Sequence, residues 1–260
     1  MTKKEAMEAS LKDPLSLENK YILGLVYLNL RKDKEAQEIF SSLLADNPAM
    51  TEAKWGMAEA LRRQHDVIES KKLLDKILKA SPGFAPALIT LAYIRYTEMD
   101  FEAAVKLAGK VLEGEPGETD LSNRVRAYLM MGGAKGMIAH YGGPLSKIVN
   151  GTAVFPNLKK AERLQPESAP VLFGLGSFYF LAPALAGGDL DRAQDYLEKA
   201  VNADPLFADA YVRLGQLYKI QGDIKKYAEY LEKALEIDPQ NELARDIKSG
   251  RCKFICKGKD

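Results

Sequence analysis

Apolar positions recur along the 260-residue chain in a block whose period is mostly 34 residues. Each block holds a large apolar residue followed by a small one, and later two apolar positions three residues apart. These spacings follow the turn of an α-helix, and small residues let two helices cross closely. The small positions are Gly24, Ala58, Ala92, Gly176 and Gly215, and Arg126 is the exception. The pattern predicts an all-α chain built from packed helix pairs.

Prolines keep the same period at the ends of the blocks. They are Pro14, Pro48, Pro82, Pro116, Pro166, Pro205 and Pro239. Successive steps are 34 residues, except for 50 residues before Pro166 and 39 before Pro205. Because proline cannot continue a helix but can begin one, it suits the junction between two repeats. The chain is therefore expected to be a repeat array with two insertions.

The order Leu-Gly, Tyr, Ala, an aromatic residue or Leu, Ala and a closing Pro resembles that of the tetratricopeptide repeat (TPR) family. It stands once as Leu23, Gly24, Tyr27, Ala36, Phe40 and Pro48, and again as Leu214, Gly215, Tyr218, Leu231, Ala234 and Pro239. The resemblance extends over roughly residues 1–248. It implies a right-handed superhelical solenoid of antiparallel helix pairs.

A single TPR array is expected over residues 1–260. Its repeats are predicted at 17–50, 51–84, 85–118, 119–168, 169–207 and 208–241. Residues 1–16 are expected to form a partial N-terminal repeat with a helix at 2–12, or else a frayed end. Residues 242–260 are expected to form a polar capping helix and a cysteine-containing tail, since the last repeat needs a water-facing surface.

The fourth repeat contains the longer insertion, near residues 132–155. Its glycines and Pro144 predict that the helix is interrupted there. Long loops in compact arrays are often functional, so His140, Tyr141 and Lys147 are candidate contact residues of a loop or lid. A structural plug is the alternative.

The fifth repeat has a short insertion. Pro183 is expected to end a helix, Gly187 and Gly188 to form a turn, and Asp189 to cap the next helix. This stretch is similar to one in the TPR-containing T-component of TRAP transporters, which implies a bacterial origin.

Charge and hydropathy exclude several classes of function. The 37 basic and 36 acidic residues nearly cancel, which disfavours nucleic acid or an anionic membrane surface as a partner. No apolar run has the length of a transmembrane helix. The N-terminal residues lack the apolar middle of a signal peptide, so a cytoplasmic location is expected. A periplasmic location is the alternative if a leader has been removed.

Candidate chemistry is sparse. The glycine-rich stretch 132–136 lacks the spacing of a phosphate-binding loop, and His65 is expected in a solvated turn. Cys252 and Cys256 cannot complete a tetrahedral zinc site by themselves, so two unpaired thiols are expected, with a disulfide as the alternative. No nucleophile-and-base arrangement stands out. Neither catalysis nor a cofactor nor a metal is predicted.

The TPR resemblance implies that the first helix of each repeat lines a concave groove. Carried over position by position, its register places these residues in the groove: Tyr21, Leu25, Trp55, Glu59, Arg62, Arg63, Ile89, Tyr93, Tyr96, Phe173 and Phe180. Trp55 stands one position after the family's usual inward tryptophan, where Lys54 is found. Trp55 is therefore expected to face the groove, with an inward orientation as the alternative.

These features predict a non-catalytic scaffold that binds a partner peptide or helix along an aromatic groove. The residues of the carboxylate clamp that binds chaperone C-termini are absent from the corresponding positions, which disfavours a co-chaperone. Two alternatives stay open. One is a periplasmic transport accessory that binds a small apolar ligand under the glycine-rich insertion. The other is a self-assembling homo-oligomer in which the N-terminal helix docks on a neighbouring chain.

Overall fold

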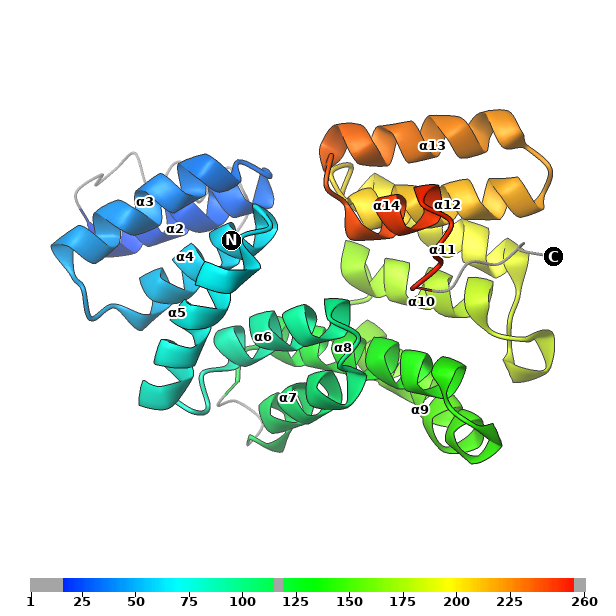
Figure 1. Cartoon of the computed structure of the whole chain (residues 1–260), viewed down its shortest axis with the longest axis horizontal. Coiled ribbons are helices and arrows are strands. Elements are labelled where there is room, and N and C mark those ends of the chain that lie inside the picture. Colours follow the sequence, from blue (N-terminus) through cyan, green and yellow to red (C-terminus); the bar gives the residue numbers. More distant parts are fainter. Residues whose placement is uncertain (1–15, 115–118, 255–260) are drawn as a thin grey trace. The chain divides into compact units, whose positions relative to one another are not determined.

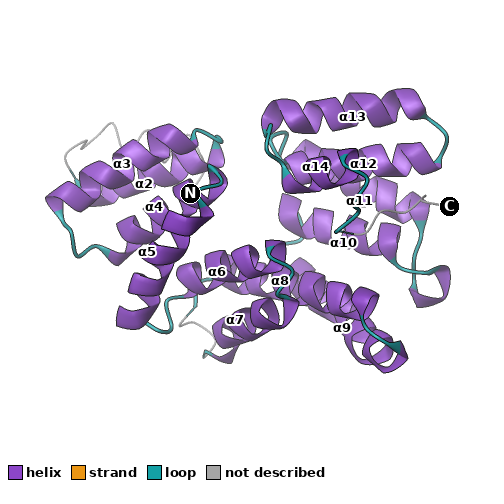
Figure 2. Cartoon of the chain, in the orientation of Figure 1, coloured by secondary structure: helices purple, strands orange, loops and turns teal. Residues whose placement is uncertain are grey.

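The computed structural model describes residues 16–114 and 119–254, and within them the chain is helical, with short turns and no strand (Figure 2). This confirms the all-α prediction. The predicted helix at 2–12 lies outside the described residues. The chain divides into two compact units, Met1–Ile94 and Arg95–Asp260. The division falls inside helix α6 (Ala85–Thr97), and each unit is described by itself.

Unit 1 consists of helix pairs joined by tight turns (Figure 1). Its helices before α6 are α2 (Leu17–Asn29), α3 (Asp33–Asp46), α4 (Thr51–Arg63) and α5 (Val67–Ala80). The pairs α2–α3 and α4–α5 fall within the 34-residue blocks at 17–50 and 51–84. Pro48 and Pro82 follow shortly after the ends of α3 and α5, where their missing N–H groups cost no helical hydrogen bond.

Unit 2 continues the alternation. Its helices are α7 (Phe101–Glu113), α8 (Leu121–Tyr141), α9 (Pro144–Leu164), α10 (Ala169–Leu181), α11 (Leu190–Ala203), α12 (Ala208–Ile220), α13 (Ile224–Ile237) and the short α14 (Glu242–Lys248). Helices α7, α11 and α13 begin at Asp100, Asp189 and Asp223, whose carboxylates accept backbone N–H groups of the first turn. Such caps satisfy donors that have no partner inside the helix.

The turns inside several helix pairs contain one residue with positive φ. Arg31, His65 and Met99 take φ values of 58°, 64° and 67°, and Gly222 takes 86° at the corresponding turn of α12–α13. The first three stand 34 residues apart, so the strain recurs with the repeat. Residues other than glycine pay a steric penalty in this left-handed region.

Met99→Gly is therefore expected to stabilise the protein. Met99 is exposed, so its replacement removes left-handed strain while it sacrifices little packing. We expect the free energy of unfolding to rise by about 0.5–1 kcal/mol, measured by urea denaturation. Met99→Ala, which keeps a Cβ and the strain, is the matched control and should bring no gain.

The glycine-rich insertion is helical, so the expectation of a loop or lid was wrong. It lengthens both helices of the fourth pair, and α8 and α9 have 21 residues each, joined at Gly142 and Gly143. Gly132 faces α9, where an added Cβ would approach Leu158 to 3.1 Å. The glycines thus permit a close helix–helix contact, and the contact offsets their poor helix propensity.

The short insertion of the fifth repeat has the predicted structure. The helix α10 ends at Leu181, and a single 3₁₀ turn at Ala184–Ala186 follows Pro183. Gly187 takes a φ of 95°, and Asp189 caps α11 by accepting the N–H groups of Asp191 and Arg192.

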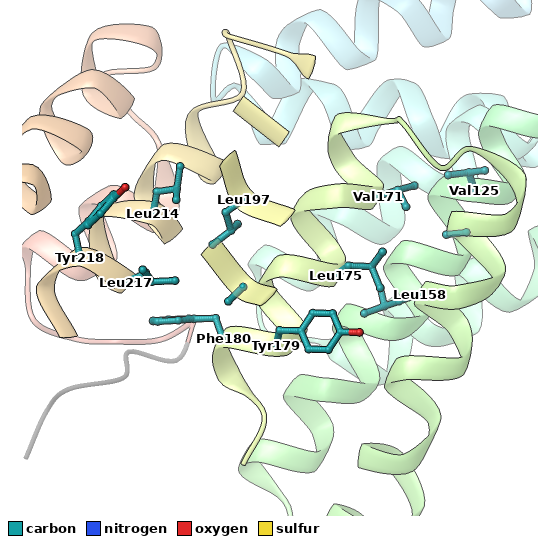
Figure 3. Packing of buried hydrophobic residues seen from close by; sticks show 12 residues of the cluster. Val125, Leu158, Val171, Leu175, Tyr179, Phe180, Leu197, Leu214, Leu217 and Tyr218 are labelled. Carbon is teal, nitrogen blue, oxygen red and sulfur yellow. The ribbon is translucent and has the colours of Figure 1, made fainter. Parts of the chain in front are cut away.

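Each unit has its own apolar core. In unit 1 the ring of Phe40 is fully buried and lies against Gly24 and Gly56, where a Cβ would come within 2.6 and 2.4 Å of it. In unit 2 the largest cluster joins α8–α12. Figure 3 shows side chains of this cluster, among them Leu175, Phe180 and Leu197. Large side chains from one helix fill the space left by small residues on its neighbour.

Cys252 is disulfide-bonded. The expectation of two unpaired thiols was therefore wrong for Cys252. Cys256 lies outside the described residues.

Candidate peptide-binding surface

In unit 1, a polar chain joins α4 to α6. The indole Nε1–H of Trp55 donates to the Thr90 hydroxyl at 3.0 Å, and that hydroxyl donates to Glu59 Oε2 at 3.0 Å. Thr90 is fully buried and Glu59 is 3 % exposed. Because buried polar groups are costly when unpaired, this chain fixes the position of Trp55 relative to both helices.

Two guanidinium groups surround the buried Glu59 carboxylate. Arg62 reaches it with two hydrogen bonds of 2.7 and 3.1 Å, and Arg63 with one of 3.0 Å. Arg63 also donates to the backbone carbonyl of Leu28 on α2 at 2.6 Å and lies 3.8 Å from the Asp33 carboxylate. Charge-assisted bonds of this kind are short and directional. One carboxylate therefore ties three neighbouring helices together.

The network ends at the protein surface. The Arg62 guanidinium lies 4.3 Å from the ring centroid of Tyr93, and Tyr93 is 36 % exposed. A guanidinium over an aromatic face is attracted to the ring's negative quadrupole. Trp55, Arg62 and Tyr93, which we call the Trp55 surface, are thus presented by α4 and α6 in a defined arrangement.

The structure places the predicted groove residues of unit 1 in two environments. Trp55, Arg62, Arg63 and Tyr93 belong to the network, while half-buried Tyr21 and Leu25 pack on the α2–α4 core. Ile89 and Glu59 are each 3 % exposed, so neither side chain presents a contact surface. Ile89 belongs to the apolar core, and Glu59 acts beneath the surface as the acceptor that orients the arginines.

The predicted groove residues of unit 2 do not form one patch. Phe180 is fully buried in the core, which corrects its assignment to an open groove. Phe173 is half-buried, and its ring meets Phe207 edge-on at 5.0 Å. Tyr96 stacks on Phe254, a residue of the C-terminal segment.

The candidate contacts of the insertion lie around the turn between α8 and α9. His140, Tyr141 and Lys147 are all exposed. The Tyr141 ring stacks on Phe101 at 6.2 Å, and its hydroxyl donates to the Lys253 carbonyl at 2.7 Å. Through this hydrogen bond Tyr141 contacts the chain's own C-terminal segment. Exposed Leu145, Ile148 and Val149 occupy the first turns of α9.

Sequence reasoning missed the roles of Thr90, Arg213 and Asp246. A lone threonine in an apolar helix carries no signal for its role as a relay between Trp55 and Glu59. Arg213 and Asp246 are 6 % and 3 % exposed. A signal was available in their placement, because each is a charged residue on an otherwise apolar helical face.

Burial raises the pKa of the Tyr96 hydroxyl to about 12, and Asp209 and Tyr141 add to this while Arg213 opposes it. In the unfolded chain Tyr96 ionises near pH 10. The folded state keeps the phenol neutral up to about pH 12, so the free energy of unfolding is unaffected by this group below pH 10 and falls between pH 10 and 12. We expect the Tyr96→Phe variant to lose roughly 2–3 kcal/mol less free energy of unfolding than the wild type over this pH range. Denaturant midpoints of both proteins across this range, together with phenolate absorbance, test the expectation.

Stacked antiparallel helix pairs with a 34-residue period define a class of helical repeat protein. The tetratricopeptide repeat model matches residues 208–241, and a model for the second ARM domain of tetratricopeptide repeat protein 21 matches residues 20–122. Together with the fold, these matches show that the chain is a tetratricopeptide repeat protein. No curated protein matches the sequence.

Solved TPR structures resemble the chain in fold. A chain of the APC/C hetero-tetramer Cut9–Hcn1 aligns with a TM-score of 0.65 at 14% identity, over 94% of this chain and 44% of that chain. A TPR protein from Parabacteroides merdae aligns with a TM-score of 0.60 at 18% identity, over 95% and 90%. PilF of Pseudomonas aeruginosa gives 0.53 at 14% identity, over 95% and 99%. The chain spans less than half of the first of these.

The described residues hold no cluster of histidine, cysteine and carboxylate side chains suited to a metal ion. Within the same residues, none of the helices combines the length and apolarity needed to cross a bilayer. TPR proteins are typically non-catalytic scaffolds, and the fold is consistent with protein–protein interaction in general.

Proposed function

We propose that this protein is a non-catalytic scaffold that binds a peptide or helix of a partner protein through the Trp55 surface. The observation that carries the proposal is the Trp55–Thr90–Glu59–Arg62 network, which holds a tryptophan, an arginine and a tyrosine in place before any partner binds. Tryptophan, tyrosine and arginine are the residues enriched in binding hot spots.

The chemistry of the surface indicates what it binds. The two arginines are balanced by Glu59 and Asp33, so the surface has no strong excess of either charge. The half-buried Trp55 and the exposed Tyr93 offer aromatic surface beside the Arg62 guanidinium. An apolar or aromatic side chain fits this combination, and preorganisation reduces the entropy lost on binding.

Site-specific photo-cross-linking tests the proposal. A photoreactive phenylalanine replaces Tyr93 in one variant and Ile68, which is 71 % exposed on α5, in the control. We expect a protein from the host lysate to be cross-linked through position 93, and not through position 68. The same cross-link should disappear in a Trp55→Ala background that retains its helical circular dichroism.

Two outcomes would contradict the proposal. One is an identical set of cross-linked proteins from positions 93 and 68. The other is a position-93 product that persists in the folded Trp55→Ala variant, because the surface would then contribute nothing to recognition.

The alternatives have less support. The transport hypothesis relied on a glycine-rich lid, and that segment consists of two long packed helices. The self-assembly hypothesis relied on the helix predicted at 2–12, which lies outside the described residues. Homo-oligomerisation therefore stays a prediction without a surface to support it.

A further inference from the structure

The C-terminal segment returns to the helices of unit 2 after α14. We call residues 251–254 the tail; it has no regular secondary structure. Phe254 is nevertheless 7 % exposed and belongs to an apolar cluster with Phe101, Met137 and Val212. A core position for a residue of an irregular segment requires specific contacts, because such segments otherwise run over the surface.

Phe254 is held at three points by side chains of the repeat array. Its backbone N–H donates to Asp246 Oδ2 at 3.0 Å, and its carbonyl oxygen accepts from Arg213 Nη2 at 2.9 Å. Its ring stacks almost parallel on Tyr96, with centroids 5.8 Å apart and an interplanar angle of 8°. Arg213 is itself oriented by a 2.7 Å bond to Gln216.

Lys253 is held by residues of α6 and α8. Its carbonyl oxygen accepts the 2.7 Å bond from the Tyr141 hydroxyl. Its ammonium group donates to the backbone carbonyl of Thr97, at the end of α6. Four helices, α6, α8, α12 and α14, thus supply the partners of two consecutive tail residues.

These contacts are those of a peptide-binding site. Main-chain N–H and C=O groups of the bound segment are met by side chains, and an aromatic side chain enters a pocket that supplies specificity. Arg213 and Asp246 are buried with the tail in place, and their hydrogen bonds to the Phe254 main chain help to satisfy these charged groups. We call Tyr96, Arg213, Gln216 and Asp246 the Phe254 site.

The tail satisfies this site incompletely. Asp246 is 3 % exposed, and its Oδ1 atom is buried without a hydrogen-bond partner among the described residues. A buried acceptor left without a donor carries a penalty of about 1–3 kcal/mol. A segment that supplies one more donor would occupy the site better than the tail does.

We propose that the Phe254 site is a second peptide-binding site, occupied in the free protein by the chain's own tail. Its partner is a protein segment with a basic residue followed by an aromatic residue, the chemistry of Lys253 and Phe254. The partner displaces the tail. This site lies in unit 2 and is independent of the Trp55 surface, so either proposal can fail alone.

Fluorescence polarisation with two fluorescein-labelled peptides tests the proposal. One peptide has the sequence of residues 249–256 with serine in place of both cysteines, and its twin carries alanine at the Phe254 position. The full chain is used as wild type and as Phe254→Pro, which removes the ring and the N–H donor and so vacates the site. Assays contain no reductant, because Cys252 is disulfide-bonded.

We expect Phe254→Pro to bind the phenylalanine peptide at least about tenfold more tightly than the alanine peptide, and about tenfold more tightly than wild type does. Binding of both peptides with equal affinity, or of neither by a folded variant, would overturn the proposal and leave the tail as a structural cap. If Phe254→Pro loses its helical circular dichroism, Phe254→Ala is judged by the same peptide discrimination.

A second copy of the chain is the other source of such a segment. Sedimentation of the wild-type protein at rising concentration distinguishes this case. If the wild type forms a dimer that Phe254→Ala abolishes, the site binds the tail of a second copy and not another protein. That result would overturn the proposal.

Discussion

Glu59→Gln is expected to lower the free energy of unfolding of unit 1 by about 3 kcal/mol. The substitution keeps the size of the side chain but removes the charge that faces two guanidinium groups. Arg62 and Arg63 side chains are 17% and 20% exposed, so water compensates them only in part. Removal of one partner from a buried ion pair is costly because the other charge stays behind.

The fluorescence of Trp55 provides a local measurement, since it is the only tryptophan of the chain. Its Nε1–H bond leads through Thr90 to Glu59, so unfolding followed by tryptophan fluorescence reports on this network. Glu52→Gln on the same helix is the matched control. Glu52 is exposed, and we expect its replacement to change stability by less than about 0.5 kcal/mol. Equal midpoints for the two variants would show that the Glu59 network contributes nothing.

Phe40→Ala is expected to destabilise unit 1 by about 3–5 kcal/mol, the usual cost of deleting a buried phenylalanine side chain. The Phe40 side chain is fully buried, with 0% of its surface exposed to solvent. Its ring lies against the backbones of Gly24 and Gly56, which cannot move inward to fill the space. The tryptophan-detected midpoint should fall more than the midpoint of total helical content.

Gly56→Ala tests the same contact from the other side. A Cβ at this position would lie 2.4–2.6 Å from the Phe40 ring, so the ring must shift. We expect a loss of about 1–3 kcal/mol in the wild-type background, despite the better helix propensity of alanine. In the Phe40→Ala background the clash is absent, and the same change should be neutral or stabilising.

The double-mutant cycle gives the coupling between positions 40 and 56 directly. Gly83→Ala is the control, because an added Cβ there meets nothing within 4 Å. Additive effects of Phe40→Ala and Gly56→Ala would contradict the idea that glycine is present to accommodate the ring.

Much of the fold could be predicted because its signals are local. The period of small and large apolar residues predicts helix pairs, and the prolines mark the junctions between them. The turn at Pro183 and the cap at Asp189 follow from the backbone limits of proline and from side-chain capping. The helix interruption predicted near 132–155 is present at Gly142 and Gly143, but the expected loop or lid was wrong, because glycine propensity ignores the packing of α8 on α9.

The candidate sites were harder to predict from the sequence than the fold, because they depend on contacts between helices. The repeat register predicted that Trp55, Arg62 and Tyr93 face one groove, and the structure brings Arg62 and Tyr93 into contact. The same register could not show that Glu59 and Phe180 are buried, because burial depends on neighbouring helices. Nor could it show that Phe254 contacts Arg213, from which it is separated by 41 residues, because no periodic pattern links them.

The sequence by itself determined the helical class, the 34-residue unit and the TPR family, since each depends on spacings along one chain. Only the tertiary structure decided which polar residues meet. The Trp55–Thr90–Glu59 chain and the docking of Phe254 depend on distances across helices. The physical reason is that buried charges and donors need hydrogen-bond partners, and these partners come together only when the helices pack.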